Sequence, residues 1–399
     1  MKRKLSDRVI NLKPSATLAI TAKANELRAK GEDVIGFGVG EPDFDTPANI
    51  KESGIRSIQA GKTKYTDVGG IKELKAAVIE KFKRDNSITY KPSEIIVSCG
   101  GKHSLYNLCM AFFEPGDEVL VPAPYWVSYP PMVELAGAAP VIIPTGRDKD
   151  FKIDSDDLAR YTTPRTKALI LNYPSNPSGG SYTEGELADI GRFCVEKSVY
   201  VVSDEIYEKL VYDGFTHTSI ASLGDDIRQM TIIVNGVSKT YAMTGWRIGY
   251  AAGPEALISA MTKIQSQSTT NASSVAQWAA VEALTGPQDE VEQMRREFEA
   301  RRKLIVDGLN AIPGVTCRNP EGAFYAFPDV SGTFGMSYSG TKITGSMDFA
   351  AFLLSEAKVA LVPGAEFGDD NCVRLSYAAS TAQITEGVRR IGEAVRKLK

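Results

Sequence analysis

The stretch KALILNYPSNPSGG, residues 167–180, decides the fold class, because a compact apolar run in it ends abruptly in polar and turn-forming residues. The pattern recurs in VYVVSDEIYEKLVY (199–212) and MTIIVNGVSK (230–239), and the helical pattern TEGELADIGRFCVEKS (183–198) separates the first two runs. Short apolar strands that alternate with helices are typical of a largely parallel sheet covered on both faces. The sequence therefore predicts an α/β fold with its ligand site at the carboxyl ends of the strands.

The pattern changes after about residue 285. A long charged helix is predicted over 289–312, a second helix around 348–358, and a polar Gly/Ser-rich loop over 331–346. Because 399 residues is long for one core, we expect two domains. The expected parts are an N-terminal arm with part of the small domain (1–45, with a helix near 17–30), a large domain (46–290) and a small α+β domain (291–399).

Charge and hydropathy exclude several classes of partner. The chain has 46 Lys and Arg against 49 Asp and Glu, a net charge of −3, which favours neither nucleic acid nor an anionic membrane. The basic start MKRKLSDRVINLKP lacks the apolar segment of a signal peptide. No apolar run reaches the ~18 residues that a membrane helix needs.

Cysteine and histidine usage limits the chemistry. The five cysteines are scattered without C-x-x-C spacing, which fits buried thiols in a reducing cytoplasm, so we expect a cytoplasmic protein. With only two histidines, a metal site or a histidine-based nucleophile is poorly supplied, and we expect none. Lysine, carboxylate or a cofactor is the expected source of any catalysis.

Several strand ends carry candidate residues, each with an ordinary alternative. Gly100 and Gly101 open a helix and could admit a phosphate, although a tight turn explains them equally simply. Trp126 could stack on a planar ring or be a half-buried aromatic. Asn176, with Asn172 and Ser175, could bind a ligand oxygen or form a polar turn.

Charged residues extend this series. Asp204, with Tyr207 three residues later, could pair with a protonated ring nitrogen or cap a helix. Lys239 could be a nucleophile in a dehydrated pocket or face solvent. Arg247 could grip a phosphate or form a surface salt bridge, and Arg374 could clamp a carboxylate or form a structural ion pair.

The order of these residues, together with longer motifs, carries a resemblance. From LKPSAT (12–17) through GEPDFDTP (40–47), KTKYTDVGGIKELK (62–75) and MTGWRIGYAAGP (243–254) to VRLSYA (373–378), the chain resembles the fold-type-I pyridoxal-phosphate aminotransferases of class I. It is most similar to the bacterial aspartate aminotransferase branch, which includes aspartate/prephenate aminotransferases. The resemblance implies a large domain with a mostly parallel seven-stranded sheet, a smaller α+β domain and a homodimer with shared active sites.

The resemblance also implies a role for each candidate. Lys239 would form the Schiff base with pyridoxal 5′-phosphate and then move the substrate proton, and Asp204 would pair with the pyridinium nitrogen. Tyr207 and Asn176 would bind the ring hydroxyl oxygen, and Trp126 would stack on the ring. The phosphate would be held by Gly101, the backbone of Lys102, Ser238, Arg247 and Tyr65 of the partner subunit. The substrate α-carboxylate would be bound by Arg374 and Asn176, with Trp126 and the backbone of Gly40 lining the same pocket.

Two departures from the better-known animal and enteric branch matter. That branch has a phosphate-binding serine three residues before the lysine, where this chain has Gly236. Its partner-subunit arginine for the distal carboxylate has no obvious counterpart here. The resemblance instead points to Lys102, Lys13, Ser15 and Thr17 for that carboxylate.

The expected reaction is L-aspartate + 2-oxoglutarate giving oxaloacetate + L-glutamate, with amination of prephenate to arogenate as a second expected activity. Alternatives on the same scaffold are a neutral or aromatic amino donor, or a β-lyase. We do not expect a non-catalytic regulator, because the chain reaches LKPSAT with no room for a DNA-binding module. A Rossmann oxidoreductase is disfavoured because no G-x-G-x-x-G follows an early strand.

Overall fold

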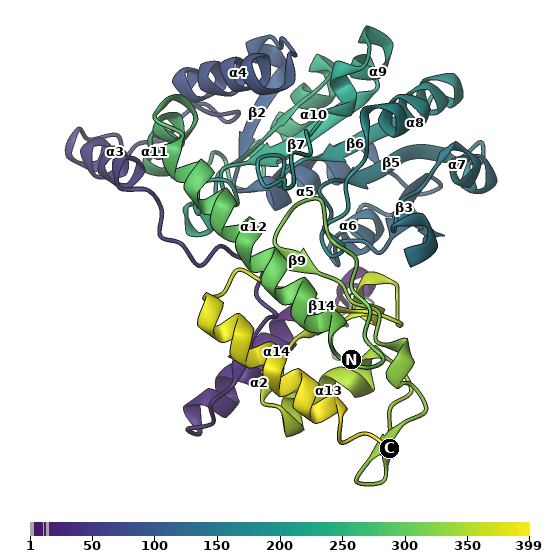
Figure 1. Cartoon of the computed structure of the whole chain (residues 1–399). Helices are drawn as coiled ribbons and strands as arrows, with labels where there is room; N and C mark the ends of the chain where they lie inside the picture. Colours follow the sequence, from purple (N-terminus) through teal and green to yellow (C-terminus); the bar gives the residue numbers. More distant parts are fainter. Residues whose placement is uncertain (1–3, 11, 13–15) are drawn as a thin grey trace.

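A mixed seven-stranded sheet forms the centre of the molecule (Figure 1). The structure is a computed structural model that describes residues 4–10, 12 and 16–399, except for the side chains of 16–19 and 21. Five neighbouring strands are parallel, and β8 alone runs antiparallel to both of its neighbours. The sheet is therefore largely parallel, as predicted. In spatial order the strands are β2 (Ile95–Ser98), β8 (Gly249–Ala252), β7 (Thr231–Gly236), β6 (Tyr200–Asp204), β5 (Thr166–Asn172), β3 (Glu118–Ala123) and β4 (Ala139–Pro144).

Helices cover both faces of this sheet because its strands are apolar on both sides. In β5, Ala168 and Ile170 enter one core cluster, whereas Leu169 and Leu171 enter another. This two-residue alternation is that of a strand buried on both faces. The helices of this part are α3 (Ala48–Gln59), α4 (Lys72–Asn86), α5 (Gly101–Phe112), α6 (Tyr129–Leu135), α7 (Ser155–Tyr161), α8 (Glu184–Lys197), α9 (Asp225–Gln229), α10 (Glu255–Ser266) and α11 (Ser274–Thr285).

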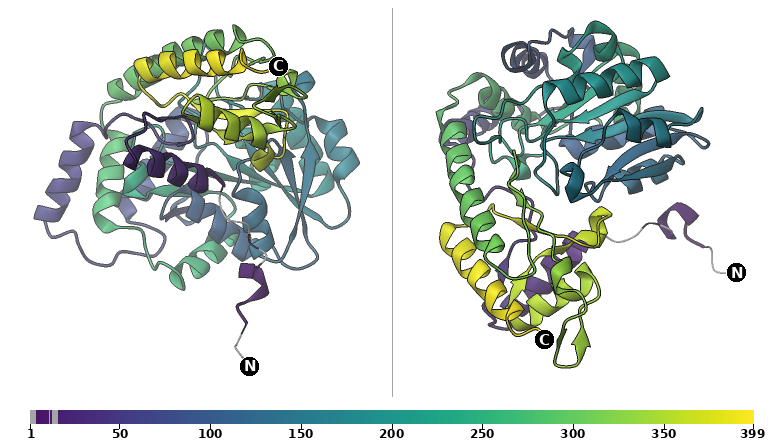
Figure 2. Two further views of the ribbon diagram at one scale, coloured as in Figure 1. Left: turned by 90° about the horizontal axis from the view of Figure 1, so that it is seen from below. Right: turned by 45° about the vertical axis from the view of Figure 1, so that its right-hand side comes forward.

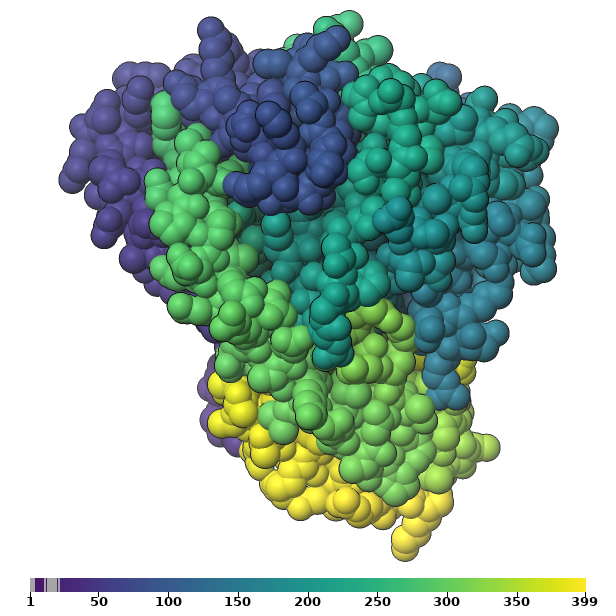
Figure 3. Space-filling model, turned by 45° about the horizontal axis from the view of Figure 1, so that its top comes forward, coloured from purple at the N-terminus to yellow at the C-terminus, as the bar shows by residue number. Residues whose placement is uncertain are grey.

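The long helix α12 (Asp289–Asn310) leads from the sheet region into a smaller part (Figures 1 and 3). A segment that precedes the sheet region in the chain joins that part, because β1 (Ile35–Gly36) pairs in parallel with β12 (Val359–Ala360). In Figure 2 the N-terminal helix α2 (Ala16–Ala29) accordingly lies beside the C-terminal elements. The remaining elements are α1 (Asp7–Ile10), β9 (Tyr325–Ala326), β10 (Ser337–Tyr338), β11 (Thr341–Lys342), α13 (Ser346–Glu356), β13 (Val362–Pro363), β14 (Val373–Ser376) and α14 (Thr381–Val395).

One expectation needs correction. The segment 331–346 is not a plain loop, since β10 and β11 form a small antiparallel hairpin inside it. Its glycine at the turn, Gly340, has a φ of 83°, which a glycine adopts without strain. None of the helices formed by the described residues is long and apolar enough to cross a membrane.

Candidate active site

Lys239 lies beyond the carboxyl end of β7, at the edge of the sheet where β5 and β6 also end. Its Nζ donates a hydrogen bond to the carbonyl oxygen of Gly40, at 2.6 Å. Burial lowers the pKa of the Lys239 amine to about 8, and nearby Arg247 and Arg374 act in the same direction. The side chain is therefore held inside the fold as a readily deprotonated amine, and it is not a solvent-facing surface lysine.

Asp204 ends β6 as a buried carboxylate. Tyr129 Oη donates to its Oδ2 at 2.7 Å, and the Ile206 N–H donates to its Oδ1 at 3.3 Å. Burial raises the pKa of the Asp204 carboxyl to about 6, although the Tyr129 hydrogen bond works against this rise. Within the described part of the chain no lysine, arginine or histidine forms an ion pair with it. A buried acid in this state is suited to a cationic ligand atom.

Arg374 on β14 is 2% exposed and also lacks a counter-ion among the described residues. Its Nη1 donates to Asn176 Oδ1 at 2.9 Å and its Nη2 donates to the Gly38 carbonyl at 2.7 Å, whereas its Nε has no partner. Burial lowers the pKa of this guanidinium. Because an unpaired buried cation is strongly disfavoured, the arrangement favours an anionic ligand, and the structural ion pair considered for Arg374 is not formed.

The amino end of α5 forms a cradle together with Arg247. Gly100 has a φ of 90°, and a Cβ at this position would overlap the Arg247 guanidinium. That guanidinium donates to the carbonyl oxygens of Thr244 at 2.8 Å and Cys99 at 3.3 Å, and no carboxylate among the described side chains pairs with it. Free N–H groups at a helix start, with a guanidinium beside them, suit a phosphate group.

Two tyrosines that the sequence did not single out complete the site. Tyr129 binds Asp204, as described above, and lies edge-on to Trp126 with ring centroids 5.3 Å apart. Tyr325 shares a hydrogen bond of 2.8 Å with Tyr207, and the Arg374 guanidinium lies 4.7 Å from the centre of the Tyr325 ring. Nothing in the sequence linked Tyr129 to Asp204 or Tyr325 to Tyr207, which lie 75 and 118 residues apart.

The remaining predicted residues are placed as follows. Lys102 Nζ lies 4.7 Å from the centre of the Trp126 ring, and burial lowers its pKa. Ser238 is buried next to Lys239, and a Cβ on Gly40 would lie 2.6 Å from Tyr325 Oη. Tyr65 is 90% exposed. Lys13, Ser15 and the Thr17 side chain lie outside the described residues.

Gly236 has a physical reason to depart from serine. A Cβ at this position would lie 3.0 Å from both the Cα of Gly249 and the carbonyl oxygen of Ile248, on the neighbouring strand and the residue before it. These distances are shorter than ordinary contacts of a side-chain carbon. The close approach of β7 and β8 therefore favours glycine here, because a serine Cβ would require the neighbouring backbone to move by a few tenths of an ångström.

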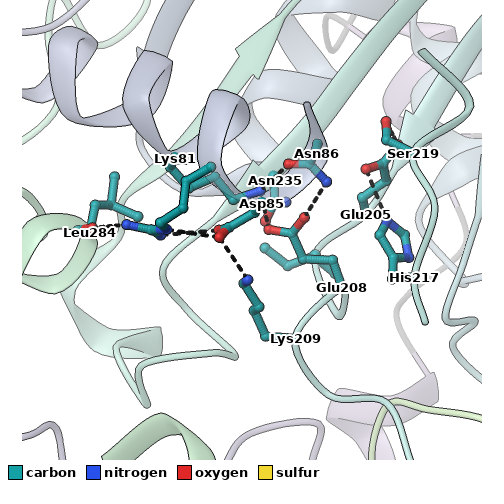
Figure 4. A network of polar contacts seen from close by, with 12 residues as sticks. Lys81, Asp85, Asn86, Glu205, Glu208, Lys209, His217, Ser219, Asn235 and Leu284 are labelled. Carbon is teal, nitrogen blue, oxygen red and sulfur yellow. Dashed lines mark hydrogen bonds and ion pairs between the residues drawn. The ribbon is translucent and has the colours of Figure 1, made fainter. Parts of the chain in front are cut away.

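A second buried cluster includes Glu205, the residue that follows Asp204 (Figure 4). Potential ligand atoms of Glu205, Glu208 and His217 lie within 4.8 Å of one another, a spacing that a metal ion could bridge. Lys81, however, forms a buried ion pair with Glu208, and His217 Nε2 lies 3.1 Å from Glu205 Oε2. The cluster thus already contains a cation for Glu208, and an internal polar network explains it.

Comparisons with known proteins agree with this geometry. Residues 32–391 match the family model described as aminotransferase class I and II. The chain is 51% identical over 396 residues to an aspartate aminotransferase of Bacillus sp. (strain YM-2), covering 99% of this chain and 100% of that protein. It is 52% identical over 389 residues to the aspartate/prephenate aminotransferase of Cereibacter sphaeroides, covering 97% of each.

Solved structures agree as well. The crystal structure of the aspartate aminotransferase from Rhizobium meliloti superimposes with a TM-score of 0.97 at 44% identity, covering 100% of both chains. The Thermus thermophilus aspartate aminotransferase with maleate gives a TM-score of 0.93, also at 44% identity, over 98% of this chain and 100% of that one. The predicted fold class is thereby confirmed.

Pyridoxal phosphate fits the residues present. The cradle of α5 and Arg247 suits its phosphate, unpaired Asp204 suits its ring nitrogen, and the amine of Lys239 suits its aldehyde. The comparisons independently indicate the same cofactor. The chain belongs to the class I and II aminotransferases, a pyridoxal-phosphate-dependent family.

Proposed function

We propose that the protein transfers the amino group of L-aspartate to 2-oxoglutarate, giving oxaloacetate and L-glutamate, and that it also aminates prephenate to arogenate. One observation carries the proposal: Arg374 is a buried guanidinium without a counter-ion among the described residues, and Asn176 is bonded to it. The names of the similar Bacillus and Cereibacter proteins support the choice of substrates.

When bound, pyridoxal phosphate supplies the electron sink that makes the α-proton of an amino acid acidic. Lys239 Nζ would hold the cofactor through its amine and would take and return the substrate α-proton. Its lowered pKa of about 8 keeps a usable fraction neutral near physiological pH. Asp204 holds the ring-nitrogen proton in place by charge, and Tyr129 orients the Asp204 carboxylate.

The other predicted residues bind and orient. Arg374 and Asn176 hold the α-carboxylate, with the Gly40 backbone and Trp126 lining the same pocket. Tyr207 and Asn176 donate to the ring hydroxyl oxygen, and Trp126 stacks on the ring. The phosphate is held by Gly101, the Lys102 backbone, Ser238, Arg247 and Tyr65 of the partner subunit, which makes the protein a homodimer. We retain Lys102, Lys13, Ser15 and Thr17 as the group that meets the distal carboxylate.

The domain division 1–45, 46–290 and 291–399 is part of the same proposal. Its support is the pairing of β1 with β12 and a core cluster that joins Ile35 and Phe37 to α12 and α14. A cytoplasmic location follows from the free cysteines, four of which are buried thiols.

The test is a panel of half-reactions with aspartate, glutamate, alanine and phenylalanine as donors, and with prephenate as acceptor. We expect kcat/KM to be highest for the dicarboxylates, since each needs a second cation beside Arg374. Lys102→Ala and Lys13→Ala should lower that preference, whereas Lys72→Ala, at the exposed start of α4, should not. A preference for alanine or phenylalanine would overturn the aspartate assignment, and elimination products in place of amino transfer would indicate a β-lyase.

A further inference from the structure

The side-chain amide of Asn172 joins two strand ends of the active site. Its Nδ2 donates to the carbonyl oxygen of Asp204 at 2.9 Å, and its Oδ1 accepts from the N–H of Asn176 at 2.8 Å. Both partners are fixed in role, because a carbonyl can only accept and an N–H can only donate. The orientation of this amide is therefore defined, and rotating it by 180° would break both bonds.

Each end of this bridge leads to a group that binds ligand in the proposed function. On one side, Asp204 carries the carboxylate that accepts from Tyr129 and would pair with the ring nitrogen in the proposed function. On the other side, Asn176 Oδ1 accepts from Arg374 Nη1 at 2.9 Å. A chain of hydrogen bonds thus runs from Asp204 through Asn172 and Asn176 to Arg374, from the sheet to β14.

We propose that Asn172 is a positioning residue that sets the spacing between the ring-nitrogen partner Asp204 and the carboxylate clamp formed by Asn176 and Arg374. The proposal rests on the proposed aminotransferase function and concerns how one site holds cofactor and substrate in register. Proton transfer at the α-carbon depends on that register, because small displacements of positioned groups reduce rates strongly.

Substitution of Asn172 leaves other bonds that preserve the fold. The Asp204 carbonyl also accepts from the Tyr173 N–H at 3.2 Å, and the loop that follows is closed by the bond from the Ser175 N–H to the Gly180 carbonyl at 2.8 Å. Asn172 is also only partly buried. Variants at this position are therefore expected to fold and to bind cofactor.

Two variants separate the two halves of the bridge. Asn172→Ala removes both bonds, so the dissociation constant of succinate, a dicarboxylate without an amino group, should rise about tenfold in the holoenzyme. Asn172→Asp keeps an oxygen that accepts from the Asn176 N–H. Its second oxygen replaces the amide donor and therefore repels the Asp204 carbonyl oxygen. This variant should bind succinate within about twofold of wild type, yet lower kcat about tenfold with a larger isotope effect for α-deuterated aspartate.

Asn310→Ala is the matched control. Asn310, the last residue of α12, also makes two hydrogen bonds through its side-chain amide. Its Nδ2 donates to the Cys317 carbonyl at 2.9 Å, and its Oδ1 accepts from the Cys317 N–H at 2.8 Å. The control variant should lower thermal stability without changing succinate binding, kcat or the isotope effect. A general loss of packing would instead move all three variants alike.

A crystal structure of the Asn172→Ala holoenzyme gives a readout that does not depend on activity. We expect Asn176 to move away from Arg374. If Asn176 keeps its position and succinate affinity is unchanged, the inference on Asn172 is wrong even when wild type transaminates aspartate. If wild type transaminates nothing but Asn176 moves, the proposed function fails and the positioning role stands.

Discussion

Three buried or half-buried charged residues define the site at the scale of single residues. Asp204 and Arg374 each lack a charged partner among the side chains that the structure describes, and Lys239 is bonded only to a backbone carbonyl. Holding charges in this state destabilises a fold, and binding a complementary ligand relieves it. Burial and unmet charge together therefore distinguish these residues from the many exposed ion pairs on the surface.

The first prediction concerns the pH at which Lys239 reacts. Because only the neutral amine attacks a carbonyl, covalent uptake of pyridoxal phosphate by the cofactor-free protein should accelerate with pH and level off above a midpoint near 8. The rate is measured by borohydride trapping and mass spectrometry of the labelled peptide. Lys239→Ala should show no label there and lose transamination by a factor of about 10²–10⁴ or more. A midpoint near the ordinary lysine value of 10.5 would contradict the burial argument.

The second prediction concerns stability at Asp204. Its folded pKa of about 6 lies above the ordinary value of 3.8, so the folded state holds a proton that the unfolded state releases. This contribution to stability is present below pH 3.8 and is lost as pH rises through 6. Asp204→Asn should therefore stabilise the cofactor-free protein by about 1–2 kcal/mol at pH 7 while abolishing transamination, because the amide removes the buried charge but offers Tyr129 and Ile206 one acceptor oxygen in place of two.

Urea unfolding of both cofactor-free proteins at pH 4 and pH 7 is the measurement. The advantage of the asparagine variant should vanish at pH 4, where wild-type Asp204 is protonated in the fold. An equal difference at both pH values would mean that charge at Asp204 does not limit stability.

Sequence reasoning reached the residues whose chemistry is unusual for their local setting. Lys239, Asp204 and Arg374 each stand in or directly after an apolar run, and the sequence alone marks them. Tyr129 and Tyr325 were missed because their roles come from hydrogen bonds to residues 75 and 118 positions away. Such contacts depend on the packing of separate elements, which no local pattern specifies. The roles assigned by resemblance stay predictions, whereas the family and cofactor are confirmed.

At the scale of elements, the close pair β7 and β8 determines how the loop to Lys239 begins. Both strands have glycine where they meet, Gly236 opposite Gly249, so their backbones approach one another near the phosphate cradle. The largely parallel sheet and its helix cover on both faces were predictable from apolar runs that alternate with helical patterns. The antiparallel direction of β8 was not, because a strand has the same pattern in either direction.

The third prediction follows from this close approach. Gly236→Ser should lower the free energy of unfolding by about 1 kcal/mol, because the new Cβ crowds the backbone at Ile248 and Gly249, which must give by a few tenths of an ångström. It should also weaken cofactor binding, although serine adds a hydrogen-bond donor. The reason is that a shift of the backbone at 236 would displace Ser238 and Lys239, which follow two and three residues later. Gly185→Ser on α8, where an added Cβ meets nothing within 4 Å, is the control and should change neither property. Tighter cofactor binding in Gly236→Ser would contradict the steric argument.

At the scale of the whole molecule, the region around α3 is unusual for a monomer surface. Ile55 and Ile58 are 54% and 56% exposed on this helix, and Tyr65 a few residues later is 90% exposed. Figure 3 shows this segment of the chain at the outer edge of the larger part. Exposed apolar side chains gathered in one region are typical of a protein interface. They support the proposal that Tyr65 completes the phosphate site of a second subunit.

The last prediction tests that sharing directly. Tyr65→Ala and Lys239→Ala homodimers should each be impaired, the first through weaker phosphate binding and the second through loss of the amine. In a mixed dimer, the Tyr65→Ala subunit supplies an intact Lys239 to one site. The Lys239→Ala subunit supplies an intact Tyr65 to that same site. That site should work normally while the other carries both defects. Unfolding and refolding the two variants together should therefore restore activity, towards half of wild type per mixed dimer.

The experiment distinguishes a Tyr65 that acts in the partner subunit from one that acts in its own subunit. If it served its own subunit, every site in the mixture would keep at least one defect, and activity would never exceed the average of the two homodimers. Refolding each variant alone is the control for recovery, and Tyr65→Phe in place of Tyr65→Ala tests the hydroxyl, which is the group that would donate to a phosphate oxygen. Restoration that depends on protein concentration would tie the shared site to dimer formation, because only assembly brings the intact lysine and the intact tyrosine together.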